Sequence, residues 1–481
     1  MNKKNLSFII KCAIGVALYL IISHLPAIAP ITDVGMELLG IVVCLIWGLL
    51  TIDSVLPSIF ALILLGFTHY SAVGHSVQFS VMTASGGFVA CLVLTLMLFS
   101  GVISQSGLAQ VMAEKIVYSK IANGRPWMLT FLIMIAGWVP SMVLTNIPVI
   151  FVMWPIMYEM FKICGFEKGD KWPAVMMVAM TFSSLVGMTC MPFNVGVAGD
   201  FAILLSLDPT CIVPSGPFIL SSIVLAVVIL LILFLIIRFI IKPDVSKLQN
   251  YKSTKTDIKF NTDQKRGLVL MILLIVIILL PECLPACGLK DFLTTLGTPG
   301  AALIVVVIAL FIRNKDGSPF MTFHQITQKG IFWPMLVMIA SINAVCGGLS
   351  TDEVGIVAFI QQSLEPIVGG MSPFVFFVLL VVIAYVLTNI FDGAVVAYIT
   401  IPIMYALAPT VGLTATALMA CMTHNVQSGL ALPSASPTAA MLFGNDEGWH
   451  TRKTAMKYGL VCAGIYLVSM IVVYYPFMKI M

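Results

Sequence analysis

Hydrophobic residues run along this 481-residue chain in blocks that are separated by short polar or basic segments. Most blocks have the length of about 17–25 residues that a helix needs to cross a ~30 Å hydrocarbon layer. The pattern predicts an all-α polytopic membrane protein with about eleven transmembrane helices. The first block, 8–25, is followed by many equally apolar ones, so we interpret it as a retained span and not as a cleaved signal peptide.

Two of the apolar blocks are interrupted by a Thr-Asn pair. Thr145-Asn146 interrupts one block, and Thr388-Asn389 interrupts another 243 residues later. The block after each pair is also broken by polar residues and a proline. Non-helical backbone inside a bilayer must be buried in protein or face a water-filled cavity. We therefore expect two re-entrant hairpins whose tips meet two broken helices. The hairpins are 126–161 and 371–406, and the broken helices are 172–205 and 414–444.

The lysines and arginines predict the orientation. With a cytoplasmic N-terminus, 23 of the 25 fall in cytoplasmic segments, and only Lys290 and Lys479 do not. This agrees with the positive-inside bias and places the C-terminus outside the cytoplasm. The hairpins then enter from opposite sides, as in an inverted-topology repeat. The predicted domains are an N-terminal span 1–33, a first repeat 34–241, a basic cytoplasmic linker 242–266 and a second repeat 267–481.

Composition supports a membrane protein and argues against several classes of function. The chain is 60% hydrophobic and 10% charged, with a mean hydropathy of +1.07, whereas soluble domains are about 25% charged. It has no basic patch with interleaved aromatics, so we expect no nucleic-acid partner. It has no His-Glu-x-x-His or Gly-x-Ser-x-Gly motif, so we expect no enzyme. Inverted repeats with broken helices are typical of secondary transporters.

The Thr-Asn pairs predict a binding site. A hairpin tip beside a proline-broken helix brings carbonyls, a hydroxyl and an amide around one small volume. Such oxygens suit a dehydrated Na⁺, and the N-terminal ends of half-helices suit an anion. A lone Thr-Asn pair in a span more often makes a helix–helix hydrogen bond. Two pairs at matched spacing, each beside a broken helix, favour a site for a small anionic substrate and sodium.

These residues resemble the divalent anion–sodium symporter family, the carriers of di- and tricarboxylates or sulfate within the ion-transporter superfamily. That family has two Ser-Asn-Thr hairpin tips and two breaks that read Gly-Thr-Pro-Pro-Asn and Ala-Thr-Pro-Pro-Asn. Here the first break is Cys190 to Asn194, and the second contains Ala435-Ser436-Pro437. The resemblance covers nearly the whole chain after the first span. It implies a homodimer in the cell membrane that performs sodium-coupled symport by moving its substrate domain like an elevator.

The resemblance also implies two overlapping sets of site residues. Substrate-binding positions are Thr145, Asn146, Thr388, Asn389, Ser436 and Pro437, and sodium-binding positions are Ser141, Thr145, Asn146, Cys190, Asn389 and Ala435. The third residue of each tip departs from the family, because Ile147 and Ile390 replace threonines that would touch the substrate. The spacing departs as well. Pro402 follows Asn389 by 13 residues, and Pro155 follows Asn146 by 9.

Charged residues near the site leave the coupling mechanism open. Asp392 lies at membrane depth, where a carboxylate is a functional hypothesis by default. It either serves coupling or caps the helix that follows the second tip. His424 either shuttles protons or packs in the core, and Asp200 either faces an outer vestibule or caps a helix. A proton-coupled carrier or exchanger using Asp392 is the alternative within transport. A channel or receptor-like membrane protein is the alternative outside it.

Overall fold

The computed structural model describes residues 3–53, 55–86, 88–250, 258–285, 287–349, 351 and 353–478. The part of the predicted linker from 251 to 257 lies outside the described residues. Nearly all of the described chain is helical, and its β structure is limited to an isolated bridge between Arg313 and Pro319. The predicted all-α class is confirmed.

Many of the helices have the length and composition of membrane spans. Among the described residues eight qualify, or ten if two bent pairs are each counted as one span. The prediction of a polytopic membrane protein is confirmed, while the side on which each terminus lies stays a prediction. The eight helices are α1 (Lys3–Ser23), α2 (Asp33–Thr51), α7 (Pro126–Val143), α11 (Ser215–Ile236), α12 (Thr262–Cys283), α13 (Gly288–Phe311), α17 (Pro373–Ile390) and α21 (Arg452–Ser469).

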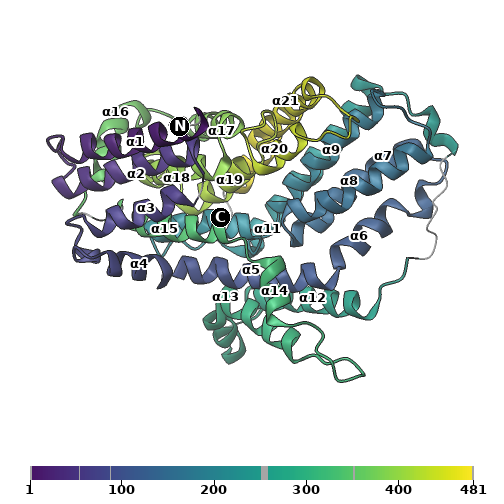
Figure 1. The fold of residues 1–481 in the computed structure, drawn as a ribbon, viewed down its shortest axis with the longest axis horizontal. Helices are drawn as coiled ribbons and strands as arrows, with labels where there is room; N and C mark the ends of the chain where they lie inside the picture. The colour runs from purple at the N-terminus through teal and green to yellow at the C-terminus, as the bar shows by residue number, and fades with distance from the viewer. Residues whose placement is uncertain are drawn as a thin grey trace.

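One group of helices packs around α5 (Phe88–Ser106), and we call α1–α5 and α12–α15 the α5 unit. α14 (Phe323–Gly330) crosses α5 so closely that a Cβ at Gly330 would lie 2.7 Å from the Gly101 Cα. α15 (Trp333–Leu349) packs on α2, α3 (Leu56–Gly66), α4 (Val77–Gly86) and α5. In Figure 1, α4 and α5 form the lower edge of the main body, and α12 to α14 lie below them.

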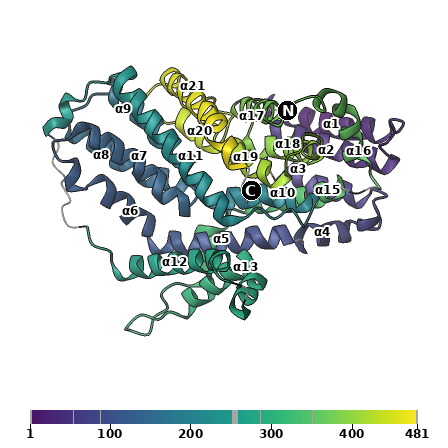
Figure 2. The same cartoon turned by 180° about the vertical axis from the view of Figure 1, so that it is seen from behind.

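The two predicted hairpins and broken helices pack together in a second group, which we call the hairpin unit. It contains α7, α8 (Asn146–Ile163), α9 (Lys171–Met188), α10 (Val195–Leu207), α11, α17, α18 (Gly393–Leu407), α19 (Ala415–Gln427), α20 (Pro437–Phe443) and α21. α7 packs on α9, and α17 and α18 pack on α19. α10 contacts both α18 and α19, so both halves of the chain share one core. Figure 2 shows α9, α11 and α21 side by side on the far face.

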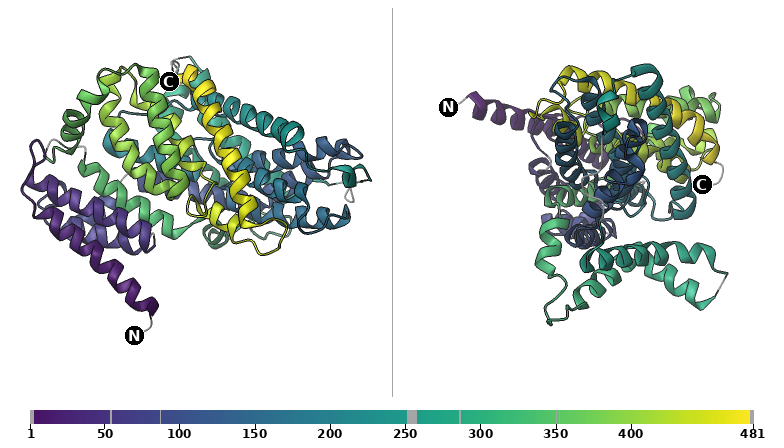
Figure 3. Two further views of the ribbon diagram at one scale, coloured as in Figure 1. Left: turned by 90° about the horizontal axis from the view of Figure 1, so that it is seen from above. Right: turned by 90° about the vertical axis from the view of Figure 1, so that its right-hand side faces the viewer.

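Two short helices connect the units. α6 (Leu108–Val117) leaves α5 at a bend of 56° and leads to the first hairpin, while α16 (Ile356–Val368) leads from α15 to the second hairpin and packs on α18. At the other edge, α1 projects from the α5 unit beside α2, as both views in Figure 3 show. Only 6% of the α1 span is buried, so most of its apolar surface is available to lipid or to another protein surface.

Candidate functional site

The first hairpin turns over two residues. α7 ends at Val143, Leu144 and Thr145 are extended, and α8 begins at Asn146 with Thr145 in its N-cap position. Asn146 is the first residue of α8 and is buried, with 5% of its surface exposed. Its Nδ2 donates a hydrogen bond to the Thr438 Oγ1 on α20. The tip of the first hairpin therefore touches the second broken helix, across the two halves of the chain.

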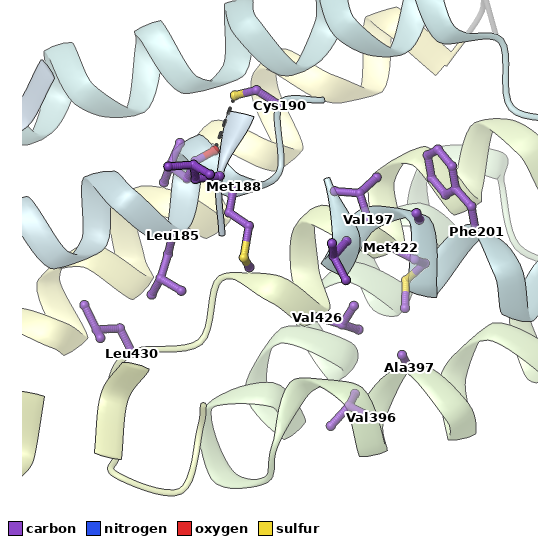
Figure 4. Packing of buried hydrophobic residues seen from close by; sticks show 14 of the residues in the cluster. Leu185, Met188, Cys190, Val197, Phe201, Val396, Ala397, Met422, Val426 and Leu430 are labelled. Carbon is purple, nitrogen blue, oxygen red and sulfur yellow. Dashed lines mark hydrogen bonds between the residues drawn. The ribbon is translucent and has the colours of Figure 1, made fainter. Parts of the chain in front are cut away.

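The first break is tied to the last turn of α7 by one amide. The Asn194 Nδ2 donates to the carbonyl oxygens of Leu144 at 2.9 Å and Ser141 at 3.2 Å. Its Oδ1 accepts from the Gly196 N–H and so caps α10. The Ser141 hydroxyl donates within its own helix, to the Gly137 carbonyl. Cys190 is fully buried, and Figure 4 shows it at the break beside Met188.

The second hairpin turns later than the Thr-Asn pair predicts. α17 continues through Thr388 and Asn389 to Ile390, Phe391 is extended, and α18 begins at Gly393. Asp392 is the N-cap of α18, and its Oδ1 accepts from the Ala394 N–H at 3.0 Å. The sequence allowed Asp392 either to cap this helix or to serve coupling, and the structure shows that it caps the helix.

The two Thr-Asn pairs are consequently not structural equivalents, and matching them was wrong. In the structure Asp392 corresponds to Thr145 and Thr388 to Ser141, both at an offset of 247 residues and not 243. The same offset relates Pro402 to Pro155, each ten residues after its cap. The second Thr-Asn pair is therefore four residues, or about one helical turn, further from its proline than the first pair. These four residues are accounted for because α17 continues past the second pair before the chain turns. Thr388 supplies a hydroxyl one turn before the second tip, as Ser141 does before the first.

The second tip is also hydrogen-bonded to the second break, but here the asparagine lies on the hairpin and the backbone groups lie in the break. The Asn389 Oδ1 accepts from the N–H groups of Leu430 at 3.2 Å and Ala431 at 2.9 Å. The Ser434 hydroxyl donates to the Ile390 carbonyl at 2.7 Å. Asn389 and Asn194 are both buried, and each bonds backbone groups where the chain leaves a helix: Asn194 at the end of the hairpin helix α7, and Asn389 in the second break.

The remaining predicted residues of the second break lie at the start of α20. Ser436 is its N-cap, accepting from the Ala439 N–H and donating to the Gly429 carbonyl. Pro437 occupies the first helical turn and is exposed, and Ala435 is fully buried. Next to Pro437, Thr438 is the partner of Asn146. Thr438 was not among the residues predicted from the sequence, although its place after the Ser-Pro of the break was a signal.

Asp200 joins the two broken helices. It is 4% exposed inside α10, and its Oδ2 accepts from the Thr423 Oγ1 at 2.6 Å and from the Gln427 Nε2 at 2.9 Å, both on α19. The expectation that it faces a vestibule or caps a helix was wrong, since Asn194 caps α10 and Asp200 lies inside the packed core. An intramembrane carboxylate of this kind is a functional-site signal that the sequence did contain.

His424 lies away from the hairpin tips. Its ring stacks on Phe218 at a centroid distance of 5.5 Å, and its Nε2 is 2.9 Å from the Ser222 Oγ. Both partners lie on α11. These contacts favour the packing alternative for this histidine.

The arrangement suits an anion accompanied by a cation. The N-terminus of α8 carries partial positive charge, and the polar groups of Asn146, Ser436 and Thr438 gather near it. Among the described residues, no hydrogen bond at either tip involves Lys or Arg, while the carboxylate Asp392 caps α18 at the second tip and the carboxylate Asp200 is buried in α10. Figure 4 shows the apolar residues of α9, α10, α18 and α19 that surround both breaks and hold them in place.

Comparisons with known proteins find transporters. A family model described as citrate transporter (CitMHS) matches residues 18–424. Two solved structures are similar over nearly the whole chain. The YdaH transporter of Alcanivorax borkumensis has a TM-score of 0.59 at 15% identity, covering 99% of this chain and 98% of its own. MtrF of Neisseria gonorrhoeae, which represents a class of antimetabolite efflux pumps, has a TM-score of 0.54 at 12% identity, covering 97% and 93%. No curated protein matches the chain.

Proposed function

Because this chain belongs to the citrate transporter family, we propose that it carries citrate or a closely related small carboxylate across the cell membrane by sodium-coupled symport. The observation that best supports a shared substrate site is the hydrogen bond between Asn146 and Thr438. It brings the first hairpin tip and the second broken helix, 292 residues apart, to one point. A transporter that binds its substrate between two repeats needs such a meeting point.

Charge balance supports coupling to a cation. The site offers amides, hydroxyls and the N-terminus of α8, while Asp392 at the second tip and the buried Asp200 in α10 are acidic. A multiply charged carboxylate in a low-dielectric site needs a compensating positive charge. We place Na⁺ at the first tip, with oxygens from Ser141, Thr145 and Cys190 as ligands. The second half offers Thr388, Asn389 and Ala435.

The packing of the hairpin unit supports an elevator movement. Its two hairpins and two broken helices are joined by hydrogen bonds that cross between the halves of the chain. A body tied together in this way is suited to move as a unit against the α5 unit, with α6 and α16 as the connections. We further propose that the α5 units of two chains form a homodimer, as the family resemblance implies.

Proton coupling is the second candidate. The specific observation that favours it is the buried Asp200, in addition to the predicted Asp392. A buried carboxylate that takes up and releases a proton as the substrate binds would couple transport to a proton gradient.

Uptake of radiolabelled citrate into proteoliposomes tests these alternatives. Sodium symport predicts saturable uptake that depends on an inward Na⁺ gradient and is lost when choline replaces Na⁺. Uptake that is unchanged in choline contradicts sodium coupling, and dependence on an inward proton gradient then supports the second candidate. A flux that does not saturate would instead indicate a channel.

Asn146→Ala tests the site itself. In the detergent-purified protein, we expect citrate to raise the unfolding temperature because a ligand that binds only the folded state stabilises it, and we expect this shift to disappear in the variant. Thr438→Val is the matched control, since it removes the same hydrogen bond but keeps the Asn146 amide, and we expect it to retain at least part of the shift. A normal citrate shift in Asn146→Ala removes this residue from the site.

A further inference from the structure

A cavity lies between the α5 unit and the hairpin unit, and no residue of either hairpin tip lines it. It has a volume of about 1030 Å³ and is lined by α10 and the segment 208–214 on one side and by α12 and α13 on the other. It reaches the first break at Pro192, but its lining contains none of the predicted substrate residues. Its size is at the upper end of the ~300–1,000 Å³ that is typical of ligand pockets.

Most of this cavity is apolar. Leu92, Phe201, Ile277 and Ile278 contribute to its walls, and Ile212 lines it while being 70% exposed. The cavity therefore reaches the surface of the molecule at an apolar rim. In a membrane protein such a rim contacts lipid chains, so the natural occupant of the interior is hydrocarbon.

One end of the cavity is polar, and a kink in α13 creates it. Gly297 has φ 60° and ψ −179°, a conformation that glycine adopts and other residues avoid, so the segment 288–296 turns away from the rest of α13. This segment contributes Lys290, Thr294 and Thr295 to the lining. Its other side exposes Phe292 by 60%, as expected for a segment at the surface of a bilayer.

Lys290 is the cation at this end. Its ammonium donates one hydrogen bond, to the Leu284 carbonyl at 3.3 Å, and an ammonium has three donors to offer. Lys290 is also one of only two Lys or Arg residues outside the predicted cytoplasmic segments. A largely apolar space whose described lining ends in one ammonium and several hydroxyls complements an amphiphile with an anionic head.

We propose that this cavity binds one phospholipid with an anionic headgroup. The phosphate lies at Lys290, Thr294 and Thr295, where charge-assisted hydrogen bonds are strongest, and an acyl chain lies along the walls toward Phe201. A small carboxylate substrate has no apolar part to fill these walls. Because the lining comes from both units, the lipid sits at the interface across which the hairpin unit would move.

Lipid binding to the delipidated, full-length protein in detergent tests this proposal by native mass spectrometry. The probes are dioleoyl phosphatidylglycerol, dioleoyl phosphatidylcholine and inorganic phosphate. We expect the wild type to retain phosphatidylglycerol in preference to phosphatidylcholine, and Lys290→Ala to weaken phosphatidylglycerol binding about tenfold, the equivalent of one ~1.4 kcal/mol interaction. Lys290→Arg keeps the positive charge and should retain the preference.

The matched control is Lys315→Ala, which removes one cation from the exposed loop between α13 and α14 and should leave binding unchanged. Equal binding of the two lipids by the wild type would show that no headgroup is recognised and would overturn the proposal. Undiminished phosphatidylglycerol binding by Lys290→Ala would overturn it as well. Inorganic phosphate that displaces phosphatidylglycerol would show that the site serves a free anion and not a lipid.

Discussion

Asp200 shows how a single buried side chain can connect the two halves of this protein. Two donors from α19 converge on one of its carboxylate oxygens, and no Lys or Arg hydrogen bond to it occurs among the described residues. Hydrogen bonds lower the cost of burying a carboxylate but leave its charge uncompensated. A bound cation or a proton would balance that charge. The sequence shows the aspartate, but it does not show that Thr423, 223 residues away, lies beside it.

Replacing Asp200 by asparagine should separate coupling from binding. The amide oxygen of Asp200→Asn can still accept from Thr423 and Gln427, so we expect a folded protein that exchanges citrate between the two sides. Gradient-driven accumulation should fall by a factor on the order of 5–150, the usual range of coupling between two sites. Counterflow and accumulation are measured in the same proteoliposomes. Asp208→Asn makes the same change in a partly buried carboxylate at the C-terminal end of α10, away from Thr423 and Gln427, and should alter neither counterflow nor accumulation.

Normal accumulation by Asp200→Asn would exclude this carboxylate from coupling. Loss of both rates together with a lowered unfolding temperature would show that Asp200 is needed for packing alone.

The hairpins illustrate which helix ends a sequence can predict. The apolar blocks, the prolines and the resemblance to a transporter family predicted the helix ends at both tips and both breaks to within a few residues, and the family is confirmed. That the two hairpins are re-entrant stays a prediction. The register of the second tip was missed because α17 ends where tertiary contacts allow, with Asn389 bonded to Leu430 and Ala431. α14 was missed for another reason. Its N-terminus is marked in the sequence by a capping box, Thr322 with Gln325, which was not used in the prediction.

Gly393 should be essential for the position of the second tip. A Cβ at this residue would lie 1.7 Å from the Val426 carbonyl oxygen, so Gly393→Ala must push α18 away from α19. We expect a loss of about 1–3 kcal/mol in the free energy of unfolding, as for other overpacked cores. Thermal unfolding in detergent measures this loss as a lower midpoint.

Gly464→Ala on α21 is the matched control for that experiment, because nothing lies within 4 Å of the added methyl group. It should leave the midpoint unchanged or raise it, since alanine is favoured over glycine in a helix by up to about 1 kcal/mol. Equal midpoints for the two variants would contradict the close approach of α18 to α19.

The relation between the two units is the feature that local sequence patterns reveal least. The pattern of residues along the chain predicts spans and hairpins, but the contacts of α10 with α5 and α15 depend on how segments far apart in the sequence pack. The cavity beside α10 has the same origin, because its walls include residues of α5, α10, α12, α13 and α15. Similarity to YdaH and MtrF over nearly their full lengths supports the same overall arrangement of helices.

If the hairpin unit moves against the α5 unit, joining α10 to α15 must stop transport. A Cβ at Gly199 would lie 3.1 Å from the Ile339 Cδ1, so the pair Gly199→Cys and Ile339→Cys places two thiols within reach of a short cross-link. We expect a short bifunctional thiol reagent with a reducible link to abolish citrate uptake by the double variant, and reduction to restore it. Citrate should still raise the unfolding temperature of the cross-linked protein, because the tips and breaks all lie within the hairpin unit. The two single-cysteine variants control for the native thiols. Uptake by a fully cross-linked sample at the rate of the reduced sample would show that substrate crosses without movement at this interface.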